Sequence, residues 1–343
     1  MDFDFSEDQE QLRDAVRKWV DKGYDFERRR AIVGAGGFDR AAYTELAELG
    51  LAGLYTSEDH GGMGMGPVEA MVVMEELGRG IVLEPLTQTL ISSAVLQTHA
   101  GADLQAAWLP RIASGEALVV LAHQERGARH HLDRCKAQAS EAGGQVALFL
   151  VERGAAGVKT EGYLTQDGAR AAEVSFANSP AQLITQSGQT ALEQAADIGS
   201  ACVCAEGVGV MDKTLAITAE YMNTRKQFNV PIATFQALRH RIADMKMQLE
   251  LARSMSYYAS LKLKAPEAER RQAMARARYQ LGNAMRFVGQ SSVQLHGGIG
   301  VTDEYIVSHY FKKLTQLEMT FGDTLHHLGE VSSRMQDTAG VFA

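Results

Sequence analysis

Residues 224–245 read TRKQFNVPIATFQALRHRIADM and contain the end of one helix, a turn and the start of the next. Pro231 ends the helical run before the turn, because proline has no backbone N–H to donate within a helix. Arg225 falls at the end of that run, where a cation complements the negative end of the helix dipole. Beyond the turn, apolar residues recur at steps of four and three over 236–263, which predicts a long amphipathic helix.

A second apolar stripe of the same kind follows this helix. Across 267–295 the apolar residues keep the helical spacing from Met274 to Leu295. Two long antiparallel helices that each carry one apolar face predict a helical bundle. Another helical run leads into Arg225 from about residue 190, so residues 188–343 are expected to form a C-terminal four-helix bundle.

The chain before this bundle falls into two further parts. Residues 1–117 are rich in helix formers, and Ser6 with Gln9 has the spacing of a capping box that starts a helix. The predicted strands are three short β-rich segments separated by glycine and aspartate: 118–124, 146–152 and 172–177. The expected fold class is therefore mainly α with a small β module, in the order α–β–α, with domains at 1–117, 118–187 and 188–343.

Composition and charge exclude several classes of protein. The net charge is −8, so the basic face of a nucleic-acid-binding protein is not expected. Apolar runs stay shorter than the roughly 18 residues that suggest a membrane span. The acidic start, MDFDFSEDQE, is unlike a secretory signal or a transit peptide. Three cysteines, an odd number, argue against a disulfide framework, so a reducing cytoplasm is the expected location.

Two more segments could carry chemistry. In QLHGGIGVTDEY (294–305) a helix ends at His296, and the two glycines that follow allow either a plain helix end or close approach of a ligand to the backbone. In TFGDTLHHL (320–328) the adjacent histidines point to different sides of a helix, so a shared metal ion is not expected. Arg225 alone fits either a helix cap or a phosphate ligand.

Together these segments resemble the acyl-CoA dehydrogenase flavoprotein family along nearly the whole chain. The resembling segments occur in the order found in that family: SEDQEQLRDAVRKWV, LAELGLAGLYTSEDHGGMGMG, MVVMEELGR, LAHQERGA, EGVGVMDKTLAITAEYMNTRKQFNVPIATFQALRHRIADM and VQLHGGIGVTDEYIVSHYFKKL. The most specific part is TRKQF with FQALRHRIADM and the downstream HGG. The resemblance implies FAD as the cofactor, acyl-CoA thioesters as substrates and an electron-transferring flavoprotein as the electron acceptor.

The resemblance also implies which residues contact FAD. Arg225 would bind the FAD pyrophosphate of a neighbouring subunit. The other implied contacts lie around it or in three further segments: Phe228 and Gln236 at the same site, Gln294, Gly297 and Gly298 at the adenosine half, Thr324 near the last helix, and Gln124 in the loop beside flavin and substrate. Gly127 shares that loop, which lacks the Thr and Ser usual in the family.

The catalytic carboxylate of the family is missing from both of its usual positions. In the family it removes the α-proton of the thioester while the β-hydrogen leaves as hydride to flavin N5. One usual position is in the loop before the last helix, and it corresponds to Phe321 or Gly322 here. The other is on the helix leading to Arg225, and it corresponds to Gly199. Asp323, one residue from the loop register, is the remaining candidate. Asp197 lies two residues from the helix register, a rotation of about 200°, so it should point away.

The β module is also contracted compared with the family. No tryptophan lies between residues 118 and 187, although the family has a Trp-containing segment against the flavin there. These departures resemble the small subunit of a heteromeric acyl-CoA dehydrogenase for pimeloyl-CoA or steroid thioesters. The expected assembly is an α2β2 complex in which a larger family subunit supplies the carboxylate. The alternatives are a non-catalytic subunit that completes the FAD site, and a stand-alone homotetramer that uses Asp323.

Overall fold

The computed structural model describes residues 5–140 and 144–335. The chain divides into two compact units. The bundle unit comprises Met1–Arg30, Pro67–Val82 and Ser200–Ala343, and the mixed unit comprises Ala31–Gly66 and Leu83–Gly199. In the described part of the chain, no helix has the length and apolar character needed to cross a membrane.

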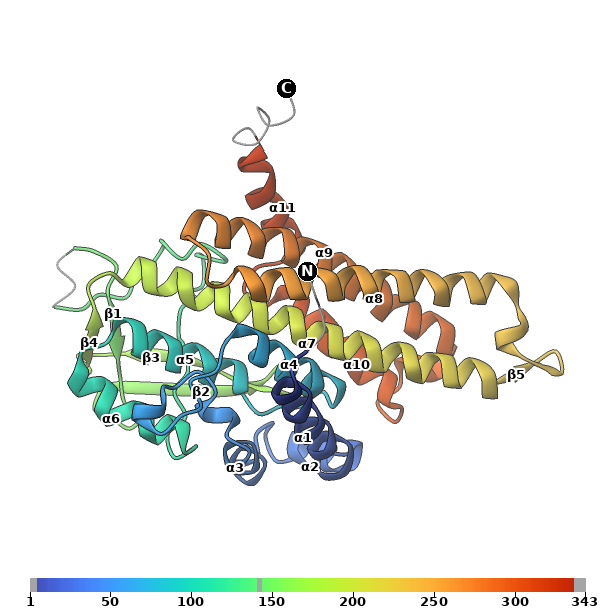
Figure 1. Ribbon diagram of the computed structural model, residues 1–343, viewed down its shortest axis with the longest axis horizontal. Coiled ribbons are helices and arrows are strands. Elements are labelled where there is room, and N and C mark those ends of the chain that lie inside the picture. Colours follow the sequence, from blue (N-terminus) through green and yellow to red (C-terminus); the bar gives the residue numbers. More distant parts are fainter. Residues whose placement is uncertain (1–4, 141–143, 336–343) are drawn as a thin grey trace. The chain divides into compact units, whose positions relative to one another are not determined.

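The bundle unit is built almost entirely from helices (Figure 1). Its elements are α1 (Glu7–Gly23), the start of α2 (Phe26–Gly34), α4 (Pro67–Arg79), α7 (Gly188–Thr224) from Ser200 onward, β5 (Lys226–Gln227), β6 (Val230–Pro231), α8 (Gln236–Lys262), α9 (Glu267–His296), α10 (Ile306–Met319) and α11 (Thr324–Ser333). Short 3-10 turns follow β6 and α9, at Ile232–Thr234 and Gly297–Val301. The capping box predicted at Ser6 and Gln9 is present at the start of α1.

Among its described residues, the mixed unit contains shorter helices and four short strands. Its elements are the rest of α2, α3 (Arg40–Glu48), α5 (Leu86–His99), α6 (Ala102–Ala113), β1 (Leu148–Leu150), β2 (Val158–Leu164), β3 (Arg170–Phe176), β4 (Gln182–Thr185) and the first turns of α7, with 3-10 turns at Leu51–Gly53 and Glu58–His60. Strand β1 pairs with β4 and strand β2 with β3, both antiparallel. The prediction of a mainly helical fold with a small β module is confirmed.

The strand predicted at 118–124 is wrong, because these residues form no strand in the structure. Side chains of α5 satisfy the backbone there: Leu121 N donates to Gln88 Oε1 (3.0 Å), and Val119 O accepts from the Ser92 hydroxyl (2.8 Å). The other predicted strands are present in part, as β1 and β3, whereas β2 and β4 were not predicted. The β-rich composition of 118–124 therefore reflects an extended segment that lies against a helix.

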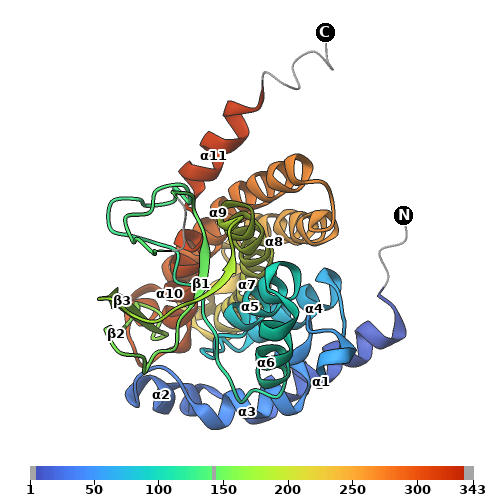
Figure 2. The same cartoon turned by 90° about the vertical axis from the view of Figure 1, so that its left-hand side faces the viewer.

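Helix α9 lies at the centre of the bundle unit and packs against α8, α10 and α11. Figure 2 shows α8 and α9 nearly end-on, side by side. Their apolar stripes form one core with the second part of α7, including Met211, Met245 and Met285. Helices α4 and α7 approach so closely that a Cβ at Gly78 would lie 2.2 Å from the Glu206 carbonyl oxygen, which explains the glycine.

Candidate functional site

The Arg225 corner, defined by Arg225, Phe228, Gln236, Gln294, Gly297 and Gly298, lies in the bundle unit. Helix α7 ends there, and strands β5 and β6 form a hairpin with Phe228 and Asn229 at its turn, both in the left-handed region (φ 53° and 64°). Arg225 N donates to the Tyr221 carbonyl, and Arg225 O accepts from Ile232 N, both at 2.8 Å. The backbone of Arg225 is thus fixed between the helix and the hairpin.

An aromatic pair joins the two halves of this corner. The Tyr221 ring stacks on His296 with centroids 4.4 Å apart, and the Tyr221 hydroxyl donates to the His296 carbonyl (3.3 Å). Tyr221 lies in the last turn of α7, and His296 is the last residue of α9. The contact therefore brings the Arg225 hairpin and the Gln294–Gly298 segment to the same end of the bundle unit.

The six residues of the Arg225 corner are exposed. Phe228 is 87% exposed and meets Phe235 edge-on. Gly297 has φ 63°, and a Cβ at Gly297 or Gly298 would meet no atom of the described chain within 4 Å. The Arg225 guanidinium makes no hydrogen bond or ion pair to residues 5–140 or 144–335. A free guanidinium at the same end of the unit as two amide side chains and open glycine backbone suits a phosphate joined to a hydrogen-bonding ring.

The second candidate region, called the 317–324 loop, runs from the last turn of α10 to the first residue of α11 and contains the position where the missing carboxylate was expected. Phe321 (φ 57°) and Gly322 (φ 106°) both adopt the left-handed region. A Cβ at Gly322 would lie 2.6 Å from His326 Cδ2 and 2.8 Å from His327 Nε2. Phe321 packs against the bundle core. A carboxylate side chain at residue 322 would therefore be strained and would have to displace the His326 and His327 rings.

Asp323 has a structural role at the start of α11. It is the N-cap residue, and its carboxylate accepts a hydrogen bond from His326 N at 2.8 Å. His327 N, one residue on, donates to the Asp323 carbonyl oxygen (3.1 Å). A side-chain oxygen that caps a helix stabilises an otherwise unpaired N–H group. The carboxylate nearest to the catalytic register is thus engaged in holding the last helix.

Thr324 is buried against α9. Its hydroxyl donates to Glu318 Oε1 (2.5 Å), and its backbone N–H donates to the same oxygen (3.0 Å). Gly282 makes this possible, because a Cβ there would lie 2.2 Å from the Thr324 hydroxyl oxygen. Arg286, one turn further along α9, donates to Glu318 Oε1 at 3.1 Å. Sequence reasoning missed Glu318, which organises this loop.

The two regions lie far apart along α9. Gly282 adjoins Thr324, whereas Gln294 belongs to the Arg225 corner and lies twelve residues later. At 1.5 Å per residue these positions are separated by about 18 Å. Thr324 and the Arg225 corner therefore cannot contact the same small chemical group.

Gln124 and Asp197 belong to the mixed unit. Gln124 is exposed in the segment between α6 and β1, and Gly127 nearby has φ 109°. The Glu125 carboxylate accepts from Lys136 N (2.9 Å) and Ala137 N (3.0 Å), which orders this segment. Asp197 is 4% exposed in α7, and Gly199, at the helix register, cannot supply an acid.

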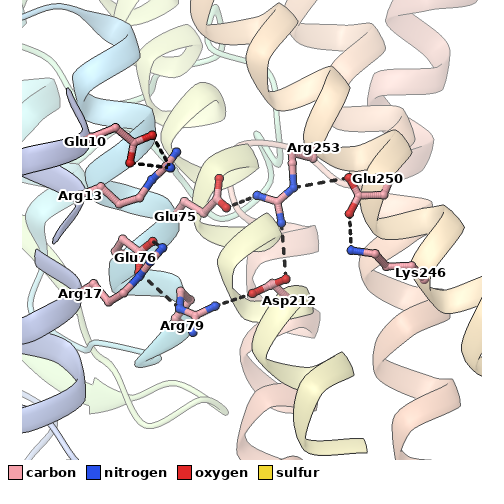
Figure 3. Close-up of polar contacts among 10 residues, drawn as sticks. All are labelled: Glu10, Arg13, Arg17, Glu75, Glu76, Arg79, Asp212, Lys246, Glu250 and Arg253. Carbon is pink, nitrogen blue, oxygen red and sulfur yellow. Dashed lines mark hydrogen bonds and ion pairs between the residues drawn. The ribbon is translucent and has the colours of Figure 1, made fainter. Parts of the chain in front are cut away.

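The bundle unit also has a polar cavity of about 550 Å³. Figure 3 shows the charged side chains in and beside it, which pair with one another. Arg17 binds Glu76 (2.6 Å), Arg79 binds Asp212, and Arg253 binds Glu75. Burial raises the pKa of Glu75, and Arg253 opposes that shift. The opposite charges compensate one another, so the cluster joins α1, α4, α7 and α8 and carries no unbalanced charge for a ligand.

Comparisons with known proteins identify the family of the chain. Residues 6–116 match the model of the acyl-CoA dehydrogenase N-terminal domain, and residues 186–335 match that of the acyl-CoA dehydrogenase C-terminal domain. The chain is 30% identical to acyl-CoA dehydrogenase IpdE2 of Mycobacterium tuberculosis over 90% of its length and 91% of the relative. It is 24% identical to FadE27 of the same organism, over 88% and 89% of the two chains.

Two solved structures are similar over almost the whole chain. The Tcur3481-Tcur3483 steroid ACAD G363A variant superposes with a TM-score of 0.88 at 25% identity and covers 97% of this chain and 99% of that one. The ChsE4-ChsE5 complex from Mycobacterium tuberculosis gives a TM-score of 0.87 at 22% identity, with 98% and 100% covered.

Proposed function

Because the chain belongs to the acyl-CoA dehydrogenase family, we propose that it is a subunit of an FAD-dependent acyl-CoA dehydrogenase whose catalytic carboxylate lies in a larger family subunit. One observation carries this proposal: a side chain at Gly322 would be strained and would displace two histidine rings, and Asp323 serves as a helix cap. A general base must come within hydrogen-bonding reach of the proton that it removes. The loop offers no carboxylate free for that purpose.

The Arg225 corner fits the FAD of the family. Its guanidinium is exposed and free of carboxylate partners in the described chain, as pyrophosphate binding requires. Gln294, Gly297 and Gly298 lie at the same end of the unit and present an amide and open backbone to an adenosine group. When bound, the flavin supplies hydride-accepting chemistry. The residues of this chain then bind and orient it at a site completed by the partner.

An exposed apolar stripe on α8 supports a partner subunit. Met247, Leu251 and Leu261 are 53%, 47% and 51% exposed and fall within a sector of about 80° around the helix. Large exposed apolar side chains in one stripe are typical of a protein–protein interface. The similar structures include a Tcur3481-Tcur3483 enzyme and a ChsE4-ChsE5 complex, whose paired names support a heteromeric assembly. We propose an α2β2 complex.

The proposed substrate is an acyl-CoA thioester with a steroid-derived acyl group. The steroid ACAD that resembles this chain at 25% identity supports this substrate class. The proposed electron acceptor is an electron-transferring flavoprotein, as the family resemblance implies. In this scheme the chain completes the FAD site of its partner and takes no part in removing the α-proton.

Co-expression with a larger family subunit tests the proposal. We expect the purified complex to hold about half as many flavins as subunits and to reduce a dye in the presence of an acyl-CoA. The matched control is this chain expressed alone, which should be inactive. A chain that binds one FAD per subunit and turns over alone would contradict the proposal and favour the homotetramer that uses Asp323.

A further inference from the structure

Arg278 is a buried arginine on α9 that faces the 317–324 loop. Only 1% of the residue is exposed, and it lies inside the apolar core face of the helix. Its Nη2 lies within hydrogen-bonding distance of four carbonyl oxygens: Leu317 (3.1 Å), Glu318 (3.1 Å), Thr320 (2.7 Å) and Gly322 (3.0 Å). One guanidinium nitrogen thus contacts the loop from its first residues to the glycine at the catalytic register.

The position of this contact matches the needs of the backbone. The last carbonyl groups of a helix have no partner within the helix, and a cation is favoured at that negative end. Leu317 and Glu318 belong to the last turn of α10 (Ile306–Met319). Beyond it, the chain turns through positive φ at Phe321 and Gly322, and at Phe321 this left-handed conformation is costly for a residue other than glycine. Arg278 adds a donor at this turn, where Leu317 O also accepts from Thr320 N (3.2 Å).

Burial of this cation has a cost. Arg278 Nε and Nη1 have no hydrogen-bond partner within the described chain. Burial lowers the pKa of Arg278, and the neighbouring Cys204 and Glu318 oppose that shift. A buried charge is generally no more stabilising than a well-packed apolar side chain. What the guanidinium adds is therefore a specific loop geometry, since an apolar residue would leave the four carbonyl groups without its N–H.

We propose that Arg278 is a positioning residue, which fixes the 317–324 loop and, through Glu318 and Gly282, holds Thr324 at the flavin edge of the assembled enzyme. The part concerning flavin rests on the proposed function. The part concerning the loop does not, because it follows from contacts within this chain. Together, Arg278, Gly282 and Arg286 form one face of α9, at steps of four residues, on which the loop is held.

The test compares Arg278→Met and Arg278→Lys in the complex with the larger subunit, with Arg276→Met, at an exposed arginine of the same helix, as control. Hydrogen exchange is read at the amides of Thr324, His326 and His327, which are hydrogen-bonded in the ordered loop. Arg278→Met should speed this exchange about 10- to 100-fold and weaken FAD binding, whereas exchange in α8 stays unchanged. Arg278→Lys should recover part of both. The control should change loop exchange less than Arg278→Met.

Two further variants keep the test decisive. If Arg278→Met does not fold, Gly322→Ala strains the loop from its other side and should produce the same rise in exchange with Arg278 intact. Arg225→Ala should lower flavin content without changing loop exchange. If Arg225→Ala keeps its flavin while exchange in Arg278→Met is fast, the Arg225 corner does not bind FAD. Arg278 would then still position the 317–324 loop. Loop exchange at the wild-type rate in a folded Arg278→Met complex would overturn the positioning role.

Discussion

Tyr221 and His296 stack with their ring centroids 4.4 Å apart, and the Tyr221 hydroxyl donates to the backbone of His296. This contact links the last turn of α7 to the end of α9, so that Arg225 and Gln294 face solvent at the same end of the bundle unit. The contact is internal, whereas the residues that it positions are exposed. The geometry of the proposed FAD site thus depends on a pair that does not itself belong to the Arg225 corner.

Tyr221→Leu should weaken FAD binding without touching the cofactor contacts. Loss of the stacked pair removes about 0.5–1.5 kcal/mol and frees the hairpin from the end of α9. Tyr221→Phe is the matched control, because it keeps the ring and loses only the hydroxyl contact. Flavin retained after gel filtration of the complex measures the effect. Equal flavin loss in both variants would show that the hydrogen bond, and not the stack, holds the corner.

Arg225→Ala should lower FAD affinity in the complex. A hydrogen bond to a charged group contributes about 1.5–3 kcal/mol, so its loss should raise the dissociation constant about 10- to 150-fold. Lys226→Ala serves as control, since Lys226 is the neighbouring exposed cation on the same hairpin. Titration of the apo-complex with FAD gives both constants. An unchanged constant for Arg225→Ala, or an equal loss for Lys226→Ala, would contradict a specific pyrophosphate contact.

Gly322→Glu should not create an active site. Residue 322 has φ 106°, and any side chain there would press against His326 and His327. A left-handed conformation costs a non-glycine residue about 1–2 kcal/mol before that contact is counted. The expected result is a lower melting temperature and no dehydrogenase activity in the chain expressed alone. If Gly322→Glu gains activity and keeps its stability, the loop can hold a catalytic carboxylate and is missing only the acidic residue.

The charged cluster of Figure 3 should make stability depend on pH. Burial raises the pKa of Glu75 above its ordinary value. The folded state then binds its proton more tightly than the unfolded state, so the contribution of Glu75 to stability falls as the pH rises from the ordinary pKa through the raised one. Glu75→Gln should flatten this slope in urea unfolding. Glu250→Gln, at a more exposed acid of the same cluster, should not.

Much of the bundle was predictable because helical periodicity reports which face is buried. The stripes in 236–263 and 267–295 became α8 and α9, and the capping box at Ser6 marked the start of α1. The strand predicted at 118–124 was wrong because β-rich composition does not reveal whether another strand or a helix supplies the hydrogen bonds to the backbone. In the structure, Gln88 and Ser92 of α5 supply them.

The candidate site was predictable only where a motif marked it. Resemblance identified Arg225 and Gln294, which stay proposed cofactor contacts. The sequence does mark Arg278 as unusual: it lies four residues after Met274 and three before Leu281, inside the apolar stripe. A charged residue at a core position points to a buried polar contact. Its partners, carbonyl groups about 40 residues away, could not be found from spacing, because they depend on how α10 returns to α9.

Turnover of the Asp323→Asn complex tests the central claim, that the catalytic carboxylate lies in the partner subunit. Asparagine caps a helix about as well as aspartate, so the substitution removes the base and keeps the fold. We predict a turnover nearly equal to that of the unsubstituted complex, with flavin content unchanged. A loss of about 10²- to 10⁴-fold, the usual contribution of a general base, in a folded and flavin-loaded complex would contradict the claim and make Asp323 the base.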